Sequence, residues 1–238
     1  MKNTHQVYLI SDSTGETLDR IFMALKAQFN NFDYLIVGIG LNTNTVPQNK
    51  SFKSTCLKNI LNKNKIDCEV IPSNVDEDPV KDSLISEGAT PEIISKNLAE
   101  LKANKVSLNK NDQFVLGADS VIDLDGELIS KPGSRKEALE ILKKLNGKPH
   151  KLISSVCISQ NNKMIWNYTD KATLFMKEFS EDELINYLSK ISDDALYAYN
   201  VYQIEGEGRN LFTKIEGDED TVMGLPIKKI KEFLEYYK

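Results

Sequence analysis

The 238-residue sequence has few of the residues that define several protein classes. Its three cysteines, Cys56, Cys68 and Cys157, include no C-x-x-C pair, which argues against a disulfide framework or a zinc site. No apolar run approaches the ~20 residues of a membrane span, and Val7–Ile10 is too short for a signal peptide. We therefore expect a cytoplasmic protein that does not use a membrane as a partner.

Positive charge is also scarce. The 30 lysines and arginines are outnumbered by 35 acidic residues, and the net charge of −5 argues against a nucleic-acid partner. Only Arg20, Arg135 and Arg209 are arginines, so a phosphate site would have to rely on lysine. The 40% apolar content is that of a globular protein, and the length fits one large domain or two small ones.

Hydrophobic patterning predicts a mixed α/β fold. Capping signals predict helices that begin after Thr90, Ser134 and Ser180, and an apolar stripe predicts a closing helix around 227–237. Asp125-Gly126 predicts a tight hairpin. Strands are predicted at 7–10, 34–37, 70–71, 114–116, 121–122, 128–129, 152–158, 164–166, 172–176, 201–204 and 211–215.

Four charged residues are candidates for a site. Asp119 follows the strand 114–116, where open α/β sheets place ligands, although a plain turn aspartate would look the same. Lys102 extends an inward row of the Thr90 helix, so it either reaches solvent at the helix end or faces an anion. Glu77, in an acidic turn at 75–79, and Lys131 would by themselves be surface residues. Two carboxylates and two lysines are nevertheless the groups that bind a Mg²⁺–triphosphate complex.

Three further positions receive structural interpretations. The Thr90 helix is expected to bury Leu101 beside its other apolar residues. His150 follows a lysine-rich helix end and is expected to be solvated. Cys157 lies in an apolar strand and is expected to be a small buried hydrophobe.

From about residue 61 to the C-terminus, the sequence resembles the Maf family of nucleoside triphosphate pyrophosphatases. The resemblance implies an enzyme that hydrolyses a nucleoside triphosphate to the monophosphate and pyrophosphate with a divalent cation, Mg²⁺ or Mn²⁺. Maf proteins are commonly homodimers, so a homodimer is the assembly that the resemblance suggests. The matching stretches are 69–77, 98–103, 117–120, 131–132, 145–150, 202–208 and 217–226.

The resemblance also implies roles for individual residues. Asp119 would be the general base, or a metal-bound carboxylate that orients the attacking water, and Glu77 would help to hold the metal. Lys102 and Lys131 would bind the triphosphate.

Two positions match those that contact or select the base in this family, Ser120 and Glu205. Glutamate rather than glutamine at position 205 is similar to the branch that acts on modified or purine nucleotides. The resemblance therefore implies a substrate among the non-standard nucleotides.

The sequence departs from the family at its phosphate-binding start, where Maf proteins carry Ser-x-Ser-x-x-Arg after their first strand. Ser54 fits the second serine, but Phe52 and Leu57 replace the first serine and the arginine. Lys58 would supply part of the missing charge as a substrate-binding residue. A competing hypothesis is therefore a Maf-like protein that binds nucleotides without turning them over.

Residues 1–60 are expected to form an atypical N-terminal segment, and residues 61–238 a Maf-like domain. Residues 5–34 resemble the start of the pyruvate, phosphate dikinase regulatory proteins, which suggests a regulatory phosphotransferase as a third hypothesis. No G-x-x-x-x-G-K-[ST] loop supports that activity. Val7–Ile10, which runs into Ser11-Asp12-Ser13, is a candidate for the missing first strand and anion loop. Pairing of this strand far from 114–116 would exclude that interpretation.

Overall fold

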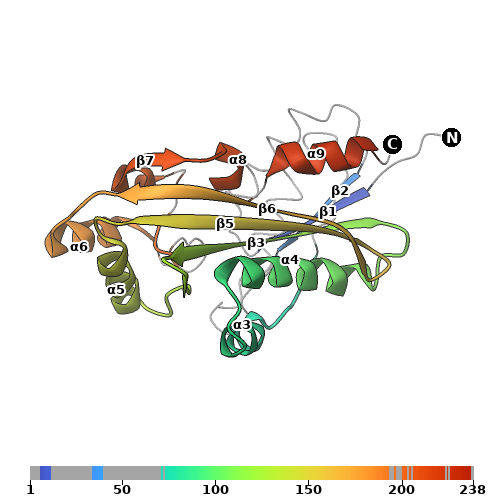
Figure 1. Cartoon of the computed structure of the whole chain (residues 1–238), viewed down its shortest axis with the longest axis horizontal. Helices are drawn as coiled ribbons and strands as arrows, with labels where there is room; N and C mark the ends of the chain where they lie inside the picture. Colours follow the sequence, from blue (N-terminus) through green and yellow to red (C-terminus); the bar gives the residue numbers. More distant parts are fainter. Residues whose placement is uncertain are drawn as a thin grey trace.

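The protein forms a twisted sheet with helices on both faces (Figure 1). The structure, a computed structural model, describes residues 6–11, 34–39, 71, 73–192, 196, 200–202, 204, 206–222, 224 and 226–236, the first two ranges by their backbone alone. None of the helices in these ranges has the length and apolar character needed to cross a membrane. In chain order the elements are β1 (Gln6–Ser11), β2 (Tyr34–Ile39), α3 (Glu77–Ser86), α4 (Pro91–Ser107), β3 (Phe114–Leu124), β4 (Glu127–Ile129), α5 (Arg135–Leu145), β5 (Pro149–Gln160), β6 (Lys163–Met176), α6 (Glu181–Lys190), the 3₁₀ helix η1 (Glu207–Leu211), β7 (Phe212–Glu216), α8 (Glu219–Val222) and α9 (Ile227–Tyr236).

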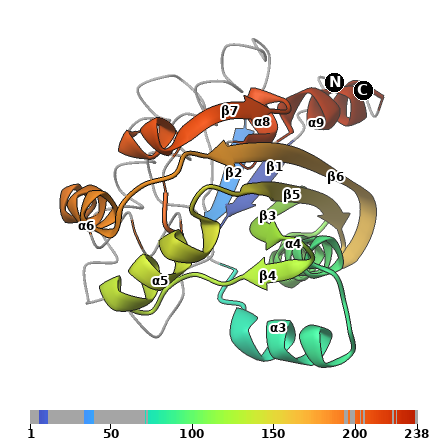
Figure 2. The same ribbon diagram turned by 60° about the vertical axis from the view of Figure 1, so that its left-hand side comes forward.

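The seven strands have the order β2-β1-β3-β5-β6-β7, and β4 pairs with β3 as a hairpin. β1 is parallel to β2 and β3, whereas the pairs from β3 to β7 are antiparallel. Helix α4 packs on one face of the sheet, and α8 and α9 lie on the other (Figure 1). Helices α5 and α6 contact each other at the end of the sheet where β5 begins and β6 ends (Figure 2). The predicted mixed α/β fold is confirmed.

Strand β1 lies between β2 and β3, so it occupies an interior position of the sheet. Val7 is in register with Phe114, and Ile10 is in register with Gly117. Val7–Ile10 thus pairs directly beside residues 114–117, and it stays the candidate for the missing first strand. Residues 12–33, which include the loop after β1, lie outside the described residues.

Helix α4 approaches β3 closely because small residues face each other at their contact. A Cβ atom at Gly117 would overlap the carbonyl oxygen of Ala99 and lie 2.8 Å from the Ala103 nitrogen. Ala99 and Ala103 are fully buried and form one apolar cluster with Val115 and Cys157. Cys157 is therefore the buried hydrophobe that its strand predicted.

The capping signals position the helices as expected. The Thr90 hydroxyl accepts a hydrogen bond from Ile93 N–H, and Pro91 follows at the start of α4. Ser180 and Glu183 form a complete capping box on α6. Ser134 caps α5, although the Glu137 carboxylate accepts from the preceding glycine N–H rather than from Ser134. The hairpin at 125–126 also forms, with both residues at positive φ.

Several sequence predictions were wrong. Strand β3 continues to Leu124 because β5 pairs with it through Asp123, so Asp119 lies within the strand rather than after it. The expected acidic turn begins α3 at Glu77, and Leu101 is 37% exposed because Lys102 occupies the buried face of α4. The strands predicted at 164–166 and 172–176 are parts of β6, whereas residue 71 and the described residues 201, 202 and 204 lie outside strands.

Candidate active site

Lys102 is the centre of the candidate site because its ammonium group is buried between two carboxylates. It lies on the buried face of α4 and has 0% relative exposure. Its Nζ lies 2.8 Å from Asp119 Oδ1 and 3.0 Å from Glu77 Oε1. A buried ammonium group needs opposite charges to replace its hydration. Lys102 therefore faces anions rather than solvent, which decides between the two interpretations that the sequence left open.

Glu77 links this buried pair to the surface. It is the first residue of α3, where the positive end of the helix dipole favours a carboxylate. Its Oε2 accepts a hydrogen bond from Lys81 Nζ at 2.9 Å, one turn along the helix. With a side chain that is 17% exposed, Glu77 lies at the boundary between the buried pair and solvent. Charges thus alternate from Asp119 through Lys102 and Glu77 to Lys81.

Asp119 lies in a part of β3 that has a described strand neighbour on one side. Among the described strands, β1 pairs with β3 only up to Gly117, and β4 begins its pairing at Ile122. Between these points β5 is the one strand of the described ranges that pairs with β3. The Ser95 hydroxyl of α4 donates a 3.0 Å hydrogen bond to the Asp119 carbonyl oxygen there. Asp119 itself is buried, with a relative exposure of 3%.

Two rows of polar side chains cross the sheet at this level, one on each face. Successive residues of a strand point to opposite faces, so Asp119 faces α4 and Ser120 faces α8. Both rows lie between apolar parts of the sheet. In the order β3, β5 and β6, the rows are Asp119, Ser155 and Thr169 on the α4 face, and Ser120, Ser154 and Asp170 on the α8 face.

The α8-facing row is closed by hydrogen bonds. Ser120 Oγ and Ser154 Oγ are 2.9 Å apart, and Ser154 donates to the Thr221 carbonyl oxygen at 2.8 Å. The Thr221 hydroxyl donates to Asp170 Oδ2 at 2.6 Å. These bonds fasten α8 to the middle of the sheet beside Ser120.

The carboxylates fit a divalent cation of the Mg²⁺ type. Glu77 Oε1 and Asp119 Oδ1 lie within 3.0 Å of the same nitrogen, so they are no more than about 6 Å apart. Mg²⁺ is commonly held by one or two carboxylates and the phosphates of its substrate. Across the described ranges no group of three or more histidine, cysteine or acidic residues could hold a metal ion. Glu77 and Asp119 could supply two of the ligands of such a cation.

Comparison with known proteins agrees with this geometry. A family model described as Maf-like protein matches residues 53–237, more than three quarters of the chain. The chain belongs to the Maf family. The match begins after β1 and β2, so these two strands of the sheet lie outside it.

Maf relatives are matched over nearly their whole length. A Pelagibacter ubique protein named nucleoside triphosphate pyrophosphatase is 69% identical over 186 residues, which cover 78% of this chain and 95% of that protein. A Caulobacter vibrioides protein with the same name is 38% identical, over 80% of this chain and 96% of its own. Among solved structures, the Staphylococcus aureus Ham1 protein matches 56% of this chain and 70% of its own at 20% identity, with a TM-score of 0.30. That score is too low to carry an argument.

The structure of this Maf chain brings three of the predicted site residues together: Asp119, Lys102 and Glu77. Ser120 is adjacent in sequence but on the opposite face of the sheet. Lys131 is half-buried, two residues after β4. Ser54, Lys58 and Glu205 lie outside the described residues.

Sequence reasoning missed the polar partners on β5. The run 152–158 was interpreted only as an apolar strand, yet it contains two adjacent serines, Ser154 and Ser155. Both are buried, and both hydrogen-bond to side chains on neighbouring strands. A pair of hydroxyls inside an apolar strand was the available signal, because buried polar groups require partners.

The expectation that His150 is solvated was wrong. The side chain is 2% exposed, and its Nε2 lies 2.9 Å from the Tyr202 hydroxyl. Burial lowers the pKa of His150 to about 4, and a hydrogen bond with the Lys148 backbone opposes this only in part. The neutral imidazole packs on Tyr202 and Phe212. His150 therefore supports the start of the stretch 202–208, which carries Glu205.

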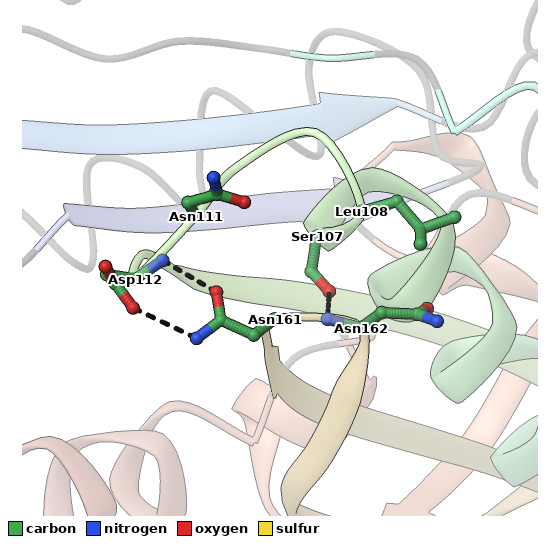
Figure 3. Close-up of a pocket in the computed structure, with 6 residues that line it drawn as sticks. All are labelled: Ser107, Leu108, Asn111, Asp112, Asn161 and Asn162. Carbon is green, nitrogen blue, oxygen red and sulfur yellow. Dashed lines mark hydrogen bonds between the residues drawn. The ribbon is translucent and has the colours of Figure 1, made fainter.

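A polar hollow of about 420 Å³ lies away from this site, between the end of α4 and the β5–β6 hairpin (Figure 3). Asp112 N–H donates to Asn161 Oδ1 at 2.8 Å, and Asn161 Nδ2 donates to Asp112 Oδ1 at 3.0 Å. The Ser107 hydroxyl accepts from Asn162 N–H at 2.7 Å. These bonds join the two loops, so we interpret the hollow as structural.

Proposed function

We propose that the protein hydrolyses nucleoside triphosphates to nucleoside monophosphates and pyrophosphate at the cluster of Asp119, Lys102 and Glu77. The observation that carries the proposal is the fully buried Lys102 ammonium, held at 2.8 and 3.0 Å by two carboxylates. Buried charges of this kind are costly for a fold to keep and are common at functional sites. The name shared by the Maf relatives supports the same activity.

In this proposal Asp119 orients the attacking water and accepts its proton. The water oxygen forms a bond to the α-phosphorus, the bond from that phosphorus to the bridging oxygen breaks, and pyrophosphate leaves. Asp119 and Glu77 would hold Mg²⁺ or Mn²⁺, which supplies charge neutralisation to the phosphates when it is bound. Lys102 and Lys131 would bind the triphosphate as point charges.

Substrate choice and the remaining binding residues belong to the same proposal. Ser120 and Glu205 would contact the base, and we propose that non-standard or modified nucleotides are the substrates. Ser54 and Lys58 would contact phosphate. We also propose that residues 61–238 are the catalytic domain of a cytoplasmic enzyme, with a homodimer as its assembly.

The segment 1–60 would contribute structure to this domain. Strand β1 lies beside β3, and its pairing with β3 ends at Gly117, two residues before Asp119. We propose that β1 takes the place of the family's first strand, because the sequence of residues 46–50 is polar rather than strand-like. This role does not require the phosphotransferase activity that the resemblance of residues 5–34 suggests.

The second candidate function is nucleotide binding without turnover. Leu57 at the position of the family's arginine favours it, because a leucine cannot neutralise phosphate. Lys58 is the nearest replacement in sequence. The two functions differ in a single observable, the release of pyrophosphate.

The test measures pyrophosphate released from a panel of standard and modified nucleoside triphosphates with Mg²⁺ or Mn²⁺. We expect release by the wild type and a loss of at least about 100-fold in Asp119→Asn. Asp123→Asn is the matched control, since Asp123 lies on the same strand and only closes the hairpin through the Gly126 N–H at 2.7 Å. Nucleotide-induced stabilisation of the wild type without pyrophosphate release would establish the binding function instead.

A further inference from the structure

The carboxylate of Glu77 is shared by two ammonium groups. Its Oε1 lies 3.0 Å from Lys102 Nζ, and its Oε2 accepts a hydrogen bond from Lys81 Nζ at 2.9 Å. Lys102 also reaches Asp119 Oδ1 at 2.8 Å, so two carboxylates and two ammonium groups form one chain of contacts. Their formal charges add to zero. Both oxygens of Glu77 are therefore in contact with positive charge.

The two ammonium groups differ in their freedom to move. Lys102 lies on the buried face of α4, and its side chain is 0% exposed. Lys81 lies on α3, a helix with no buried residue, and its side chain is 19% exposed. A lysine that already reaches solvent can turn into water at little cost, whereas a buried ammonium needs anionic partners. Lys81 is therefore the ammonium that can leave Glu77.

A divalent cation at Glu77 is in conflict with Lys81. The cation would have to share with Lys81 a carboxylate that both its oxygens already offer to ammonium groups. At a separation of about 6 Å, a divalent cation and an ammonium group repel by the equivalent of about tenfold in affinity, even in a medium as polar as water. Lys81 therefore opposes the binding of a cation to this carboxylate.

A triphosphate changes this balance because it brings anionic oxygens of its own. Mg²⁺ in such sites is held by one or two carboxylates together with phosphate oxygens. Phosphate oxygens also accept charge-assisted hydrogen bonds from ammonium groups. When the carboxylates turn to a cation, the buried Lys102 can then keep an anionic partner. The repulsion from Lys81 is thus outweighed when the nucleotide is present and not before.

We propose that Lys81 suppresses cation binding at Glu77 in the nucleotide-free protein, so that the cation enters the site together with a triphosphate. Lys81 is a positioning residue in this account, because it acts through the Glu77 carboxylate. The inference rests on the proposed function and adds a residue that controls when the cation of that site binds.

The test measures the dissociation constant of Mn²⁺ for the nucleotide-free protein by calorimetry. Lys81→Met should bind Mn²⁺ about tenfold more tightly than the wild type, because the ammonium no longer opposes the cation. Lys81→Gln, a second neutral variant, should do the same. Lys81→Arg keeps the charge and should stay within about threefold of the wild type. A merely structural role of Lys81 would weaken the binding of Mn²⁺ in the neutral variants rather than tighten it.

Two controls separate the contact with Glu77 from a general effect of charge. Lys143→Met is the matched control, because Lys143 also pairs with a glutamate of its own helix, Glu140, at 3.4 Å on α5. It should leave the Mn²⁺ affinity within about twofold of the wild type. In the Glu77→Gln background, adding Lys81→Met should not tighten Mn²⁺ binding, since Lys81 acts through that carboxylate.

A second titration tests the dependence on nucleotide. The probe is a nucleoside triphosphate analogue with a methylene group between the α- and β-phosphates, which cannot be cleaved there. Coupling between two ligands is reciprocal, so the factor by which Mn²⁺ improves analogue binding reports how far the analogue improves Mn²⁺ binding. This factor should be about tenfold smaller in Lys81→Met than in the wild type.

The outcomes distinguish the inference from the proposed function. The inference is overturned if Lys81→Met binds Mn²⁺ no more tightly than the wild type, or if it keeps the wild-type coupling to the analogue. Tightening that persists in the Glu77→Gln background also overturns it. None of these titrations requires turnover. If the wild type releases no pyrophosphate, the proposed function fails, and the titrations still decide the role of Lys81.

Discussion

The ammonium group of Lys102 is completely buried and lies 2.8 Å from the carboxylate of Asp119. This contact joins α4 to β3 at the point where β3 has a strand neighbour on one side only among the described strands. The ion pair holds the helix on the sheet. In the proposed function, it also concentrates charge where a triphosphate and its cation would bind.

Removing the ammonium should destabilise the fold. Lys102→Met keeps an unbranched side chain, one atom shorter, but leaves the Asp119 and Glu77 carboxylates facing each other without the cation between them. We expect the free energy of unfolding, measured with urea, to fall by about 3–5 kcal/mol. Lys171→Met breaks an exposed ion pair with Glu92 and should cost less than about 1 kcal/mol. Equal effects of the two substitutions would show that the buried pair is unimportant to stability.

The same variant tests the fit of a divalent cation without measuring activity. Without nucleotide, the Lys102 ammonium of the wild type competes with Mn²⁺ for the Asp119 and Glu77 carboxylates, and Lys102→Met removes this competition. Millimolar Mn²⁺ should therefore raise the Tm of Lys102→Met by several degrees more than that of the wild type, because a ligand stabilises the state that binds it. Adding Glu77→Gln should remove the difference. A Tm response to Mn²⁺ that is the same in all three proteins would argue against a metal at these carboxylates.

Gly117 should not tolerate a side chain. A methyl group there would overlap the Ala99 carbonyl oxygen, which belongs to the α4 backbone and has little freedom to move. Gly117→Ala is expected to lower the free energy of unfolding by about 2–3 kcal/mol. Gly133→Ala is the matched control, because its nearest neighbour at 3.3 Å is the end of the flexible Glu137 side chain. A harmless Gly117→Ala would mean that α4 does not pack on β3 as described.

His150 should make stability depend on pH in acid. Its pKa of about 4 in the folded protein is below the value of 6.5 for an unfolded histidine, so the unfolded state binds the extra proton first. Stability is therefore complete above pH 6.5 and falls as the pH is lowered toward 4, by about 3 kcal/mol. Urea unfolding of the wild type and of His150→Phe over this range isolates the contribution. Parallel pH profiles of the two proteins would contradict the burial of a neutral His150.

Strand β1 should be essential to the sheet. It pairs on both sides, with Leu9 opposite Val37 on β2 and Leu116 on β3. Proline in an interior strand removes a ladder hydrogen bond and fits poorly, so Leu9→Pro should cost about 3 kcal/mol or more. Hydrogen exchange at the β3 amides should accelerate in the same variant. If neither changes, residues 6–11 do not hold the interior position.

Local signals in the sequence predicted much of the fold. The caps at Thr90, Ser134 and Ser180 depend on bonds within one turn, and all three position their helices. The hairpin at 125–126 depends only on the two residues of its turn. What could not be predicted depends on distant partners. β3 continues past Gly117 because β5 pairs with it, and His150 is buried because Tyr202 and Phe212 cover it.

The candidate site, like the fold, could be predicted from the sequence only in part. Asp119, Lys102 and Glu77 were named from the sequence, but their direct contact depends on how α3, α4 and β3 pack together. The hydrogen bond that fastens α8 to the sheet joins Ser154 to the carbonyl group of Thr221, 67 residues away. No pattern within β3 or β5 contains that information, because a backbone carbonyl is present at every residue.

The most direct test of the account follows the oxygen of the attacking water. The wild type is incubated with its preferred nucleoside triphosphate and Mg²⁺ in H₂¹⁸O, and the products are analysed by mass spectrometry. The account predicts nucleoside monophosphate with one ¹⁸O and unlabelled pyrophosphate, because water attacks the α-phosphorus. Formation of nucleoside diphosphate with labelled inorganic phosphate, or label in the pyrophosphate, would contradict it.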